Sequence, residues 1–98
     1  MKIQESEINR CIIDAVMAAF MGRMKAIHSP ESGVYWVYRT NCNPSRSEPD
    51  GAVAGVIFGD NHAEIYRQYS GVYQLRYDLE DPNYDVNELV IQISNIIK

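Results

Sequence analysis

Four stretches rich in β-branched and aromatic residues follow one another in the middle of the chain, and they constrain the fold most. Such residues favour strands. Asp60-Asn61 and Ser70-Gly71 are two-residue turn signals, and turns this short join antiparallel neighbours. We therefore expect a four-stranded antiparallel meander. Its strands are Gly33–Thr40, Ala52–Gly59, His62–Tyr69 and Val72–Leu79.

The segment before the first strand predicts one long helix from Ser6 to about Ile27, with Ser6 as its N-cap and Pro30 ending it. Placed at 100° per residue, its apolar side chains cover an arc wider than one packing contact requires. The surplus apolar surface can be buried within the domain or in a homodimer.

A second helix is expected at the end of the sequence. Asp85 followed by Glu88 resembles a capping box, and Tyr84 before the cap can pack on Leu89 as a hydrophobic staple. One apolar stripe then continues to the last residues, so we expect this helix to pack on the sheet. The predicted fold is α+β, a single domain over residues 1–98.

Bulk composition indicates a folded, soluble protein. Hydrophobic residues make up 46% and charged residues 22%, which are ordinary globular values. No apolar run approaches the roughly 20 residues that span a bilayer, and no secretory signal pattern is recognisable. Cys11 and Cys42 show no disulfide framework spacing, so we expect free thiols and a cytoplasmic location.

No motif in the chain indicates a reaction. His28, His62, Cys11, Cys42 and Glu64 fit no tetrahedral metal spacing, and no glycine-rich nucleotide element is present. A nucleophile, its base and an orienting acid are not brought together by any recognisable pattern. We therefore expect no catalytic residues, no metal and no cofactor.

The stretch from Tyr66 to Glu88 holds five of the seven tyrosines and five carboxylates. Tyrosine offers a rigid contact surface with a polar tip, which is typical of docking sites. Residues 51–98 carry seven acids and three bases. This imbalance repels phosphate backbones and attracts basic protein surfaces, so direct nucleic-acid binding is disfavoured.

The register of the last hairpin divides these tyrosines. If the Ser70-Gly71 turn sets it, Tyr69 faces Val72 and Tyr66 faces Leu75. Tyr73 and Tyr77 then become core residues. The predicted partner-binding residues that remain share one sheet face or continue it: Tyr69, Arg67, Arg76, Asp78, Glu80 and Asp81.

These features favour a small acidic protein-binding module that occludes a larger protein with a basic surface. Inhibitors and immunity-type proteins work in this way, and a phage inhibitor of a host defence complex, such as an anti-CRISPR protein, is one example. The alternative is a small ligand-binding or enzymatic domain, dimeric through the first helix. Its site would lie near Trp36, the 41–51 loop and His62.

Overall fold

The computed structural model describes residues 4–41, 51–67 and 71–98, and it has the α+β architecture predicted from the sequence. The described part of the chain contains two helices and one antiparallel sheet of five strands. In chain order the elements are α1 (Glu7–Ala18), β1 (Met24–His28), β2 (Tyr35–Arg39), β3 (Ala54–Phe58), β4 (His62–Arg67), β5 (Gly71–Arg76) and α2 (Val86–Ile97).

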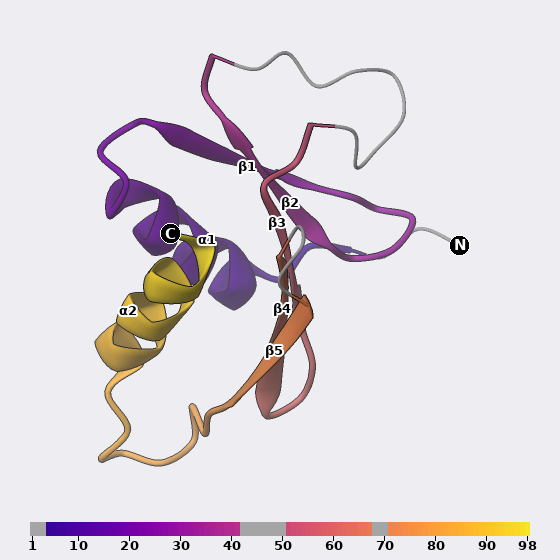
Figure 1. The fold of residues 1–98 in the computed structure, drawn as a ribbon. Helices are drawn as coiled ribbons and strands as arrows, with labels where there is room; N and C mark the ends of the chain where they lie inside the picture. Colours follow the sequence, from indigo (N-terminus) through magenta and orange to yellow (C-terminus); the bar gives the residue numbers. More distant parts are fainter. Residues whose placement is uncertain (1–3, 42–50, 68–70) are drawn as a thin grey trace.

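The strands form a meander in which each pairs with the next, in the order β1-β2-β3-β4-β5. Both helices lie on the same side of this sheet (Figure 1). The hydrophobic core joins them to that face: Ile13 of α1 and Leu89 of α2 are fully buried together with Val56 and Ile65 of the sheet. The opposite face is left without a helix in the described residues.

Both predicted helix starts are confirmed. The Ser6 hydroxyl accepts a hydrogen bond from the Asn9 amide at 3.5 Å, and the Asp85 carboxylate accepts one from the Asn87 amide at 2.9 Å. Tyr84 packs against the core cluster in front of α2, as a staple residue should. These interactions satisfy amide groups that the first helical turn leaves free.

The predicted length of the first helix is wrong. The helix ends at Ala18 and does not continue to Ile27, because Met21 and Gly22 adopt positive φ angles of 55° and 81°. Left-handed residues of this kind end a helix and redirect the chain. Residues 24–28 then form β1, a fifth strand that was not predicted from the sequence. The wide apolar arc arose because strand residues had been placed on a helix.

The predicted register of the last hairpin is also wrong. Tyr66 pairs with Val72 and Arg67 pairs with Gly71, so the connection contains three residues instead of two. The pairing is shifted by three positions, and an odd shift exchanges the two faces of a strand. Tyr66 therefore shares a face with Val72, whereas Arg67 lies on the face that the helices cover.

Each helix has 12 residues. At 1.5 Å per residue this is well below the roughly 30 Å of a bilayer core. None of the helices in the described ranges could therefore cross a membrane.

Candidate functional site

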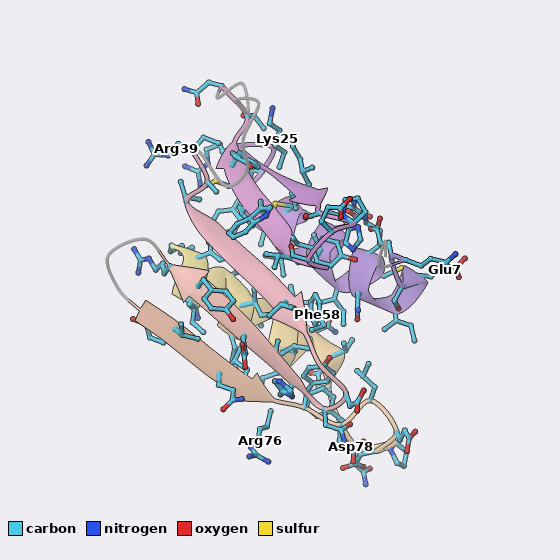
Figure 2. The ribbon with its side chains drawn as sticks, turned by 90° about the vertical axis from the view of Figure 1, so that its right-hand side faces the viewer. Glu7, Lys25, Arg39, Phe58, Arg76 and Asp78 are labelled. Carbon is cyan, nitrogen blue, oxygen red and sulfur yellow. The ribbon has the colours of Figure 1, made fainter. Side chains whose placement is uncertain are left out.

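The sheet face that carries no helix presents a row of three residues across neighbouring strands. Trp36 of β2 pairs with Gly55 of β3, and Gly55 pairs with Tyr66 of β4. A Cβ atom added at Gly55 would lie only 2.7 Å from Cζ3 of Trp36, so the indole ring rests directly on the glycine. We call Trp36, Gly55 and Tyr66 the aromatic platform. The face can be seen in Figure 2, where α2 lies behind the strands.

A depression of about 250 Å³ lies on the platform and is lined by Trp36, Gly55, Tyr66 and Arg67, together with Ala52, Val53 and Ala54 where the chain enters β3. Binding sites for drug-sized molecules are usually larger, from about 300 to 1,000 Å³. The alternative ligand site was expected near Trp36. Trp36 and Tyr66 do line the depression, whereas the buried Tyr38 is not among its lining residues. A volume of this size suits one inserted side chain better than a whole ligand.

Glu64 holds Tyr66 in place. The Tyr66 hydroxyl donates a hydrogen bond of 2.8 Å to Glu64 Oε2, and this bond to the carboxylate raises the pKa of the tyrosine. His62 Nε2 lies 3.9 Å from the other oxygen of the same carboxylate. Residues 62, 64 and 66 follow the two-residue period of one strand face. That spacing is the signal that could have identified Glu64 from the sequence.

Apolar side chains around the platform are accessible to solvent. Tyr66 is 37% exposed and Val72 is 58% exposed, while Trp36 and Ile57 are half-buried. Exposed apolar groups that gather on one face are typical of interaction sites. We call this set, Trp36, Ile57, Tyr66 and Val72, the open face.

The structure does not bring the predicted partner-binding residues together. Arg76 ends β5 on the side of the open face, whereas Arg67 ends β4 on the opposite side and donates a hydrogen bond of 3.1 Å to the main-chain oxygen of Lys98. Tyr69 lies outside the described residues. Asp78, Glu80 and Asp81 are exposed in the connection between β5 and α2.

Two of these acids have a local structural role. Asp78 Oδ1 accepts a hydrogen bond from the Glu80 amide at 3.0 Å, and Asp81 Oδ1 accepts one from the Asn83 amide at 2.9 Å. Short-range bonds of this type stabilise turns. The carboxylates nevertheless remain at the surface and keep their charge available to a partner.

Further acids lie at the same end of the sheet. Asp60 occupies the turn between β3 and β4, and the carbonyl oxygen of the adjacent Asn61 accepts a hydrogen bond from the Tyr77 amide at 3.0 Å. The connection after β5 therefore runs beside this turn. We call this region the acidic end, and it comprises Asp60, Asp78, Glu80, Asp81, Asp85 and Glu88.

The residues of the alternative site are not all neighbours. Trp36 lies across Gly55 from Tyr66, but His62 is four residues earlier than Tyr66 on β4, which is about 13 Å along a strand. Cys42 and residues 43–50 of the 41–51 loop lie outside the described residues. No group of three or more His, Cys, Asp or Glu side chains in the described ranges could hold a metal ion.

A scan against protein-family models, a search of curated proteins and a search of solved structures find no match to this chain.

Proposed function

We propose that this protein is a small binding module that docks on a larger protein through its open face and occludes part of that protein's surface. One observation carries the proposal: α1 and α2 pack on the same side of the sheet, which leaves apolar side chains uncovered on the other side. Antiparallel sheets commonly bury one face and expose a polar one. Here the exposed face is partly aromatic.

The aromatic platform has the properties of an interface anchor. Tryptophan and tyrosine are enriched among residues that dominate binding energy, especially where their positions are fixed before binding. Contact with Gly55 limits where the Trp36 ring can lie, and the bond to Glu64 orients Tyr66. The depression between the two rings has room for one side chain of a partner.

The acidic end supports a partner with a basic surface. Six carboxylates gather at the end of the sheet where β4 begins and β5 ends. Opposite charges beside an apolar contact accelerate association and exclude partners of the wrong charge. An inhibitor or immunity-type protein that covers a basic functional surface would combine these two features.

The proposal is tested first by capture. The tagged protein is incubated with an extract of the organism that encodes it, the captured protein is identified, and its affinity is measured with purified components. Tyr66→Ser should weaken binding at least tenfold, because an anchor lost from the centre of an interface costs more than about 1.4 kcal/mol.

Tyr73→Ser is the matched control. Tyr73 is 41% exposed, close to the 37% of Tyr66, but it pairs with Ile65 and therefore belongs to the other face of the sheet. This variant should bind within about twofold of the wild type, since it removes no contact on the open face. Equal losses in the two variants would contradict docking through this face. A wild-type dimer that Tyr66→Ser dissociates would assign the face to a second copy of the chain.

A further inference from the structure

A basic hollow of about 690 Å³ lies at the end of the sheet opposite the acidic end. Four of the residues that line it are cationic: Arg23, Arg39, Arg67 and Lys98. Arg39 is seen near Lys25 at one end of the sheet in Figure 2, and Asp78 is seen at the other end. An acidic chain of net charge −4 thus keeps a separate concentration of positive charge.

The four cations come from four different parts of the fold. Arg23 follows α1, Arg39 ends β2, Arg67 ends β4 and Lys98 follows α2. Their spacing along the chain gives no sequence motif, and only Arg67 was among the predicted partner-binding residues. The meander brings them together because β2 and β4 run in the same direction. Their C-terminal ends therefore lie at one end of the sheet, and the C-terminal ends of both helices lie there too.

None of these cations is paired with an Asp or Glu side chain in the described part of the chain. The ion pairs there join Arg10 to Glu5 and Asp14, and His62 to Glu64. Like charges that share one hollow repel each other unless a counter-charge balances them. The hollow therefore favours an anion.

Helix capping explains only part of the cluster. Arg23 Nε donates a hydrogen bond of 3.2 Å to the carbonyl oxygen of Phe20, after α1, and Arg67 donates one to the main-chain oxygen of Lys98, after α2. Cations commonly stabilise helix C-termini in this way. Each guanidinium carries five N–H donors, so most of the donors remain free. The side chains of Arg39 and Lys98 make no such bond within the described ranges, and capping does not account for them.

We propose that the basic hollow binds a phosphorylated small molecule. Guanidinium groups form paired hydrogen bonds to phosphate oxygens, and a dianion balances several cations better than a single carboxylate does. The volume lies within the usual range for a ligand site, and apolar residues such as Phe20 and Ile97 line it beside the cations. The phosphate lies among the arginines, and the remainder of the ligand packs on this apolar lining.

The hollow shares Val53 and Arg67 with the lining of the depression on the open face, but its ligand is a small molecule, so its test needs no protein partner. Isotope-labelled protein is titrated at constant ionic strength with inorganic phosphate, adenosine monophosphate and adenosine, and amide chemical shifts are recorded. We expect saturable shifts around Phe20, Thr40 and Ile97 with both phosphate compounds, tighter for the nucleotide. Adenosine alone should give none. Saturation by adenosine, or no saturation by either phosphate compound, overturns the proposal.

Arg39→Gln is the decisive variant, because Arg39 is exposed and bonded to nothing in the described ranges. This variant should weaken the binding of adenosine monophosphate at least tenfold, as expected for the loss of a charge-assisted hydrogen bond, and it should leave the melting temperature unchanged. Lys25→Gln is the matched control. Lys25 pairs with Tyr38 next to the Met24–Arg39 pair, so it lies at the same end but on the other face. If both variants weakened nucleotide binding equally, the binding would reflect non-specific electrostatic attraction, and this result would contradict a specific phosphate site.

Discussion

At the scale of single residues, Tyr35 is the most unusual group of the core. Its side chain is 2% exposed, its ring contacts His28 with centroids 5.0 Å apart, and the guanidinium of Arg10 lies 5.4 Å from its centroid. The buried hydroxyl has no hydrogen-bond partner of acceptable geometry among the described residues. Burial, followed by the nearby Glu5 carboxylate, raises the pKa of Tyr35 to about 12.

Tyr35→Phe should therefore be tolerated. The change removes an unsatisfied buried hydroxyl and keeps the ring contacts, so we expect unfolding at pH 8 to cost about 1 kcal/mol more than in the wild type. Denaturant titration measures this difference directly. A variant that is less stable by more than about 1 kcal/mol would show that the hydroxyl has a partner after all.

The same substitution makes a prediction about pH. The tyrosine ionises near pH 10 in the unfolded chain but near pH 12 in the folded one, so the wild type loses stability as the pH rises through this window. Tyr35→Phe lacks this contribution. Its stability advantage over the wild type should grow between pH 9 and pH 11, and a constant difference would contradict the raised pKa.

Gly55 determines where the Trp36 ring can lie. Gly55→Ala places a methyl group 2.7 Å from Cζ3 of Trp36 and 3.2 Å from Cγ1 of Val34. The ring must move, and overpacking of this kind costs about 1–3 kcal/mol. Trp36 is the only tryptophan of the chain, so its fluorescence reports the displacement.

The double variant Trp36→Leu, Gly55→Ala provides the control. Once the large ring is absent, the added methyl group should cost much less, and the two substitutions should not be additive. Unchanged fluorescence and stability in Gly55→Ala would show that the ring does not rest on this glycine.

At the scale of secondary structure elements, local sequence signals predicted where the helices begin better than where the first helix ends. Ser6 and Asp85 were found because a cap depends on side chains a few residues apart. The end of α1 was missed because Met24 and Ile27 continue a helical apolar pattern, although they belong to a strand. Gly22 was the local sign of the break, and long-range pairing of β1 with β2 decides the outcome.

Met21 gives a direct test of this chain reversal. Its φ is 55° and its side chain is 86% exposed, so a smaller residue loses little contact there. In a left-handed conformation glycine is favoured over alanine by about 1 kcal/mol, whereas inside a helix alanine is favoured by a similar amount. Met21→Gly should therefore be more stable than Met21→Ala. The reverse order would indicate a helix that continues through this position.

The register of β4 and β5 limited what could be predicted of the candidate site. A two-residue turn at Ser70-Gly71 was consistent with the local sequence, but the observed connection has three residues. Because of this difference, Arg67 and Arg76 lie on opposite faces of the sheet, and Tyr66 pairs with Val72. The row of Trp36, Gly55 and Tyr66 depends on the pairing of three strands, which no local pattern specifies.

At the scale of the whole molecule, charge is separated along the sheet. The basic hollow and the acidic end lie at opposite ends, although composition shows only a net charge of −4. Two surfaces of opposite sign on one small domain can bind different molecules without competing for the same residues. The acidic stretch from Asp78 to Glu88 was visible in the sequence because its residues are close in the chain, whereas Asp60 and the basic hollow were not, because they depend on contacts between distant residues.

The acidic end should control how fast the partner of the open face associates. Glu80→Lys reverses one exposed charge in this region, and we expect it to slow association about threefold at low salt and less at high salt. Glu31→Lys is the control, because it makes the same charge change in the turn between β1 and β2. The edge strand β1 lies on the opposite side of the sheet from β5, which leads into the acidic connection. Stopped-flow measurements at two salt concentrations compare the association rates of the two variants. Identical rates would show that the acidic end does not control association.

Docking through the open face is tested most directly by a pair of variants with equal exposure. Val72 on β5 and Ile91 on the outer side of α2 are each 58% exposed. Introducing arginine at either position adds the same charge and bulk to opposite sides of the molecule. We predict that Val72→Arg weakens binding to the purified partner at least tenfold, because the substitution buries a charge at the contact. Ile91→Arg should bind the partner as tightly as the wild type does. Unchanged binding by Val72→Arg, or equal loss in both variants, would contradict the proposed function.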